Sequence, residues 1–282
     1  INSEKKKNKL TRDEIISKAF LFHRQGNINQ AEKYYKYFLD QGFSDPIIFS
    51  NLGTICEKKG KLALAKDLYQ QSIDLFPFCP EAYSNLGLLL KNQGNKKKAE
   101  ILIRKAIDLK PDFVDAYSNL GSLLIESNRI KEAFIFLKKA IELKPDLAEA
   151  HNNLGNIYAL LDNPEDAELS LKKAIYFNPN LYSAYVNLGS TLQNIGKTDE
   201  AKKYLYKAIK IDSKQSSGYC NLAKLFVDLG MLDKAESTIA QAIKIKPDCG
   251  LAYYIFSILN PCNSYDYIYK KIFSDSLLDV LN

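Results

Sequence analysis

Asparagine recurs along this chain at a constant spacing of 34 residues. A carboxamide carries both hydrogen-bond donors and an acceptor, so it can pair with the backbone amide of an extended peptide. A row of such groups would hold a peptide with little preference for its side chains. A soluble polar row that binds no ligand is the alternative interpretation. The six residues are Asn51, Asn85, Asn119, Asn153, Asn187 and Asn221.

Polar residues also flank these asparagines, one position before them or three positions after them. Because they repeat with the same spacing, we include them among the candidate peptide-binding residues, where they would supply specificity. The flanking candidates are Ser84, Ser118, Asn152, Ser122, Asn156, Ser190 and Lys224.

No pattern in the sequence predicts catalysis. Gly196-Lys197-Thr198 ends like a phosphate-binding loop, but six residues separate Gly189 from Gly196 where that loop needs four. His151 stands at a position that other repeats give to an aromatic residue, and His23 stands alone, so both are predicted to be structural. We therefore expect no catalytic residue and no cofactor in this chain.

The cysteines are scattered and odd in number, and the sequence contains no C-x-x-C pair. With only two histidines in the chain, neither a metal site nor a disulfide framework is expected. These features favour a reducing, cytoplasmic location. The five cysteines are Cys56, Cys79, Cys220, Cys249 and Cys262.

The asparagines belong to a longer repeated pattern of 34 residues. Most of them begin the tripeptide Asn-Leu-Gly, and an alanine follows twelve residues after its last member, as in Gly121 and Ala133. Each period contains two amphipathic helical patterns of about fourteen residues, separated by glycine, asparagine or aspartate. Small residues at these two positions would allow two antiparallel helices to approach closely. One helix pair cannot bury its apolar face alone, so the pairs must stack.

This pattern resembles the tetratricopeptide repeat family. The resemblance implies an all-α, right-handed α-solenoid of seven helix pairs with a C-terminal capping helix. An eighth first helix is expected at 250–260, after a basic tail at 1–11, and residues 261–282 would form an amphipathic cap or begin a further domain. The repeat units are placed at 12–45, 46–79, 80–113, 114–147, 148–181, 182–215 and 216–249.

Charge and hydropathy exclude other classes of protein. The net charge is +6, and the first eleven residues contribute +3 of it, which leaves too weak a field for nucleic-acid binding. No apolar run is long enough to cross a membrane. Because the chain begins with Ile1, it is expected to be part of a longer protein.

The resemblance also suggests how the chain works. In this family the first helices line a concave face, and the stretch 150–156 resembles the superhelical arm of O-linked N-acetylglucosamine transferases, where an asparagine ladder recruits protein substrates. A clamp for a free carboxylate is not expected, because Glu81, Asp115 and Glu149 make the groove edge acidic. The sequence thus predicts a protein or peptide partner in a groove. The alternatives are the arm of a larger glycosyl- or sulfotransferase, as in similar bacterial arrays, and self-association through terminal helices.

Overall fold

The computed structural model describes residues 10–259, and every regular element in that range is an α-helix. Most of the basic tail and the predicted cap at 261–282 lie outside the described residues. None of the described helices is long and apolar enough to cross a membrane. The helices are α1 (Arg12–Arg24), α2 (Ile28–Asp40), α3 (Pro46–Lys58), α4 (Leu62–Leu75), α5 (Pro80–Asn92), α6 (Lys96–Leu109), α7 (Val114–Glu126), α8 (Ile130–Leu143), α9 (Ala148–Leu160), α10 (Pro164–Phe177), α11 (Tyr182–Asn194), α12 (Thr198–Ile211), α13 (Ser216–Asp228), α14 (Leu232–Ile245) and α15 (Gly250–Leu259).

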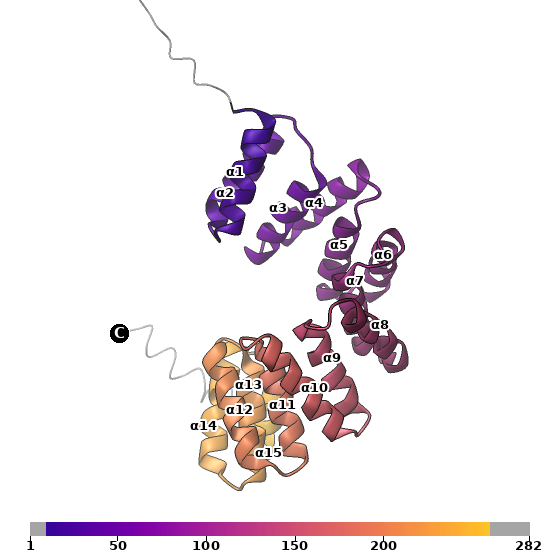
Figure 1. Ribbon diagram of the computed structural model, residues 1–282. Helices are drawn as coiled ribbons and strands as arrows, with labels where there is room; N and C mark the ends of the chain where they lie inside the picture. Colours follow the sequence, from indigo (N-terminus) through magenta and orange to yellow (C-terminus); the bar gives the residue numbers. More distant parts are fainter. Residues whose placement is uncertain (1–9, 260–282) are drawn as a thin grey trace, which may run out of the picture. The chain divides into compact units, whose positions relative to one another are not determined.

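The helices form successive pairs, which Figure 1 shows as short antiparallel hairpins. The chain divides within α8 into two compact units, Ile1–Lys139 and Ala140–Asn282. In each unit a first helix packs on its own second helix, and the second helix packs on the first helix of the next pair. The prediction of an all-α solenoid of helix pairs is therefore confirmed.

Local sequence signals set where the helices begin and end. The Asp45 side chain accepts hydrogen bonds from the backbone N–H groups of Ile47 and Ile48, and Pro46 occupies the first helical position of α3. After α3, Gly60 has φ of +73°, which is the left-handed conformation that ends a helix with little strain for glycine. Asn128 and Asp162 take the same role, with φ of 58° and 56°. The predicted inner turns are confirmed.

Small residues let the two helices of a pair touch. A Cβ atom built on Gly121 would lie 2.5 Å from Cγ of Leu137, and Ala133 is fully buried. In the second unit, α15 covers the last pair: its Ile255 and Phe256 are buried in one cluster with Ile239 of α14. Each pair thus buries its apolar faces against its neighbours.

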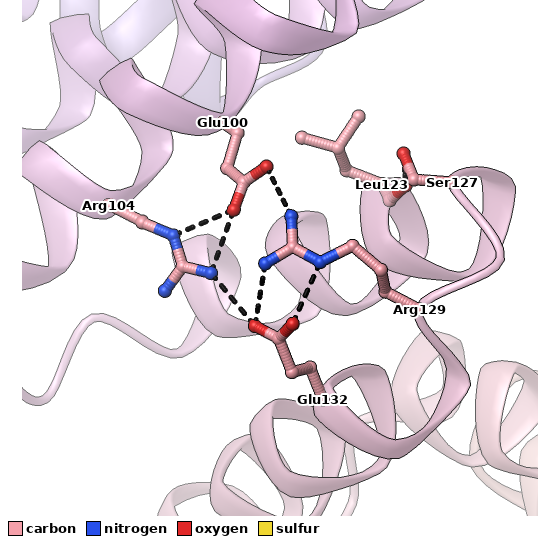
Figure 2. A network of polar contacts seen from close by, with 6 residues as sticks. All are labelled: Glu100, Arg104, Leu123, Ser127, Arg129 and Glu132. Atoms are coloured by element: carbon pink, nitrogen blue, oxygen red, sulfur yellow. Dashed lines mark hydrogen bonds and ion pairs between the residues drawn. The ribbon is translucent and has the colours of Figure 1, made fainter.

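Ion pairs connect the second helix of one pair with the second helix of the next pair or with the residue before it. In the first unit, Glu100 of α6 accepts hydrogen bonds from Arg104 (2.9 Å) and from Arg129 (2.7 Å), the residue that precedes α8. Both arginines also bond to Glu132 of α8, so the four side chains form the closed network of Figure 2. Burial raises the pKa of Glu100, but the hydrogen bonds from both arginines outweigh this effect and lower it. The two positive arginines and the two negative glutamates give this network no net charge.

Candidate functional site

The asparagine row connects neighbouring first helices. In the first unit, Nδ2 of Asn119 on α7 donates a hydrogen bond to Oγ of Ser84 on α5 over 3.3 Å. In the second unit, Nδ2 of Asn187 on α11 donates to Oδ1 of Asn152 on α9 over 3.0 Å. These bonds fix the orientation of the carboxamides and leave Oδ1 of Asn119 and of Asn187 without a protein donor among the described residues. An oriented row of acceptors can receive backbone N–H groups.

The other asparagines differ in how much of the carboxamide is already engaged. Nδ2 of Asn51 donates to the hydroxyl of Tyr35 over 3.2 Å, and Nδ2 of Asn221 donates to the carbonyl oxygen of Ser217 over 3.0 Å. Oδ1 of Asn153 lies 3.5 Å from Nδ2 of Asn152, which is long for a hydrogen bond. Asn85 makes no side-chain hydrogen bond within residues 10–259, so both its donor and its acceptor are open to a ligand.

The predicted flanking residues fall into two groups. Ser84, Ser118 and Asn152 are buried, with exposed fractions of 1%, 8% and 8%. Ser84 and Asn152 therefore act on the row by orienting its amides. The remaining flanking candidates are partly or fully exposed: Ser122, Asn156, Ser190 and Lys224.

A pocket of about 410 Å³ opens beside Asn85 in the first unit. Tyr69 of α4 donates its hydroxyl hydrogen to Oε2 of Glu57 over 3.3 Å, and its oxygen lies 3.2 Å from Oγ1 of Thr54. Burial raises the pKa of Tyr69 to about 12, so its hydroxyl stays protonated at neutral pH. The pocket is lined by Thr54, Glu57, Lys58, Tyr69, Asn85 and Leu88. It combines a carboxylate, an ammonium, a carboxamide and one apolar wall, which suits a polar side chain.

Sequence reasoning did not identify Glu57 and Tyr69 as site residues. Tyr69 had a detectable signal, because the residues at equivalent positions of all later repeats are aliphatic, as in Ile103 and Leu137, and only the first repeat also has a tyrosine there, Tyr35. A tyrosine in their place brings a hydroxyl group close to Asn85 of the asparagine row. Lys91 was also missed: its ammonium donates to Ser122 over 2.7 Å and pairs with Glu126 over 3.0 Å.

The two histidines have structural contacts. Nε2 of His151 lies 2.9 Å from the carbonyl oxygen of Pro145, and its ring stacks on Phe177. The Tyr117 hydroxyl donates to the carbonyl oxygen of Pro111 in the equivalent place of the preceding repeat, so His151 fills an aromatic position as predicted. Nδ1 of His23 lies 2.7 Å from the hydroxyl of Tyr35. Among the described residues, no three His, Cys, Asp or Glu side chains gather where they could hold a metal ion.

Comparisons with known families and structures agree with this architecture. Profiles described as tetratricopeptide repeat match residues 21–78, 80–113, 148–181, 182–215 and 216–249, and one described as TPR repeat matches 121–162. No curated protein matches the sequence.

Solved structures with the same fold share little sequence with this chain. A tetratricopeptide repeat protein from Parabacteroides merdae has a TM-score of 0.67 at 18% identity, over 88% of this chain and 98% of that one. PilF of Pseudomonas aeruginosa has a TM-score of 0.61 at 21% identity, over 76% and 96%. The Cut9–Hcn1 assembly of APC/C has a TM-score of 0.77 at 15% identity, over 86% of this chain, which spans only 48% of the matched chain. At these identities the likeness establishes the fold alone.

Proposed function

Since the chain belongs to the tetratricopeptide repeat family, we propose that it is a protein-interaction scaffold whose asparagine row holds an extended peptide. The observation that carries this proposal is the pair of bonds from Asn119 to Ser84 and from Asn187 to Asn152. They hold the carboxamides in place before a ligand arrives, which reduces the entropy lost on binding. Backbone N–H groups of the peptide would then donate to the open Oδ1 atoms.

The pocket beside Asn85 would select one side chain of the peptide. Asn85 can pair with a peptide group through both its donor and its acceptor, and Glu57 can accept from a donor-bearing side chain. The asparagine row would thus give affinity for any extended peptide backbone, and the pocket would give preference for one kind of side chain. Activity as the recruiting arm of a larger transferase is the second candidate, which the sequence of 150–156 favours. A cytoplasmic location and the placement of the seven units stay predictions.

The asparagine row can be tested by a triple substitution in the full chain. Peptides are selected by display on the wild-type protein, and their Kd is compared with that for the Asn119→Ala, Asn153→Ala, Asn187→Ala variant. Each lost hydrogen bond weakens binding by about 1 kcal/mol, so Kd should rise about 100-fold. A matched control replaces the exposed lysines Lys105, Lys131 and Lys173 of the second helices with alanine, and its Kd should stay near the wild-type value. Unchanged affinity in a triple variant that keeps its circular dichroism would refute the proposal.

A second experiment compares the contributions of two neighbouring asparagines, Asn85 and Asn51, to peptide affinity. Asn85→Ala removes a carboxamide that has no intramolecular bond, whereas Asn51→Ala removes one whose Nδ2 already donates to Tyr35. We expect Asn85→Ala, which removes an open donor and an open acceptor, to raise Kd for the same peptide about 30-fold, and Asn51→Ala, which removes one open acceptor, to raise it about 5-fold. Isothermal titration calorimetry measures both. Equal losses would show that the open carboxamide of Asn85 has no special part in binding.

A further inference from the structure

Two cysteine side chains meet at the last helix of the second unit. Sγ of Cys220 on α13 lies 3.8 Å from Sγ of Cys249, the residue directly before α15. Cys220 is fully buried, and Cys249 is partly exposed. The two residues are 29 positions apart, and the whole of α14 lies between them. This contact is not apparent from the sequence, where neither cysteine belongs to a recognisable pair.

We propose that Cys220 and Cys249 form an oxidisable pair that closes into a disulfide when a peroxide is the oxidant. Sulfur atoms in a disulfide are about 2.0 Å apart, so the two must approach by a little under 2 Å. Cys249 lies outside the helices, where the backbone can adjust more easily than within α13. The partner for a new bond is thus already in van der Waals contact.

The chemistry balances with hydrogen peroxide alone. The thiolate of Cys249 attacks one peroxide oxygen, which gives a sulfenic acid at Cys249 and releases hydroxide, and this takes up the thiol proton to form water. The sulfur of Cys220 then attacks the sulfenic sulfur, the S–S bond forms, and hydroxide leaves and takes up the Cys220 proton as a second water. In total, two thiols are oxidised and one peroxide is reduced to two waters.

Exposure sets the order of these steps. Cys249 can meet the peroxide, whereas Cys220 is sealed from it and can only resolve the intermediate. Burial also raises the pKa of Cys220 to about 12, which keeps it a thiol at neutral pH. Closure of the disulfide should therefore accelerate as the pH rises from 7 to 9.

The disulfide would secure α15 to the helix pair that it covers. Among the described residues, α15 packs only on α13 and α14, through Ala252, Ile255 and Phe256. Tyr254 and Ile258 on the same helix are exposed. A bond from Cys249 to α13 restrains the start of α15 and limits its separation from the core. Reduction would remove this covalent restraint and leave α15 held by its non-covalent packing on α13 and α14.

The test uses the full chain with Cys262→Ser, so that Cys249 is the only thiol in its tryptic peptide. Trypsin should give 215–224 with Cys220 and 245–270 with Cys249, because the bond between Lys246 and Pro247 resists cleavage. After treatment with hydrogen peroxide, mass spectrometry should show these peptides joined, with two hydrogens fewer than their sum. Cys79 is the control: it occupies the position equivalent to Cys249 five repeats earlier, and Ser50 occupies the position equivalent to Cys220. Cys79 should therefore remain a free thiol that can be alkylated in denaturant.

A second measurement distinguishes a restraint on α15 from an incidental bond. Amide exchange of α15 should slow about 10-fold on oxidation and recover with reductant. Cys249→Ala leaves the buried Cys220 in place and should show no change with peroxide. Failure to recover the joined peptides at pH 9, with both thiols still open to alkylation, would overturn the proposal. So would a cross-link that leaves exchange in α15 unaltered.

Discussion

Replacement of Gly155 by valine should destabilise the second unit by about 3 kcal/mol or more. Gly155 lies on α9 where the helix meets α10. A Cβ atom there would stand 2.5 Å from Cγ of Leu171 and 3.2 Å from the carbonyl oxygen of Ala167. Leu171 and Ala167 are both fully buried, so neither can move into free space. Valine adds two further methyl groups, and the helices of the pair would have to separate.

Urea unfolding followed by circular dichroism measures this effect, and amide exchange in α9 and α10 locates it. Gly155→Ala should cost less, about 1–2 kcal/mol, because only one carbon must be accommodated. Ala223 provides a matched control, since the seventh repeat has alanine at the equivalent position and Ala223 is fully buried. Ala223→Gly should cost about 1 kcal/mol from helix propensity. A valine variant as stable as the wild type would show that α9 and α10 do not approach this closely.

The fold could be predicted because each repeat carries the same local signals. Gly155, Ala167 and the turn at Asp162 have equivalents in other repeats, at intervals of 34 residues. An irregular residue in one repeat therefore does not hide the pattern that the other repeats share. A period of this kind specifies which helices pair and which faces are buried. The second helices carried another signal that could have been used: glutamate occurs at one position of every second repeat, at Glu32, Glu100, Glu168 and Glu236.

The candidate site could be predicted only in part. Spacing places the asparagines of each unit at the same position of successive first helices, but it does not show which atoms of each carboxamide are already bonded. That depends on whether the preceding helix offers an acceptor, as Ser84 does for Asn119. The pocket at Tyr69 and the contact between Cys220 and Cys249 arise from departures from the repeat, which a search for regularity passes over. Specific functions in a repeat protein are therefore sought where a repeat differs from its neighbours.

Glu32 is a buried carboxylate whose charge we expect to contribute to stability. It lies on α2 with an exposed fraction of 8%, and it accepts hydrogen bonds from Lys36 and from Lys59, which follows α3. The bonds from Lys36 and then Lys59 lower the pKa of Glu32 to about 2. Because the folded-state pKa is depressed, the contribution is complete above the unfolded-state pKa near 4.5 and is lost as the pH falls toward 2. The shift corresponds to about 2–3 kcal/mol once screening at the two lysines is allowed for.

Glu32→Gln should therefore lower the free energy of unfolding by about 2 kcal/mol at pH 7 and by less than half as much at pH 3. Glutamine keeps the shape of the side chain and removes the titrating charge, so the difference between the proteins reports the charge. Urea unfolding at a series of pH values between 7 and 2.5 measures it. Glu81→Gln is the matched control, because Glu81 is 46% exposed and pairs with Lys110 only at 3.7 Å, and its effect should be small at every pH. A loss for Glu32→Gln that is the same at pH 7 and pH 3 would show that Glu32 acts through packing and that its charge does not join α2 to the end of α3.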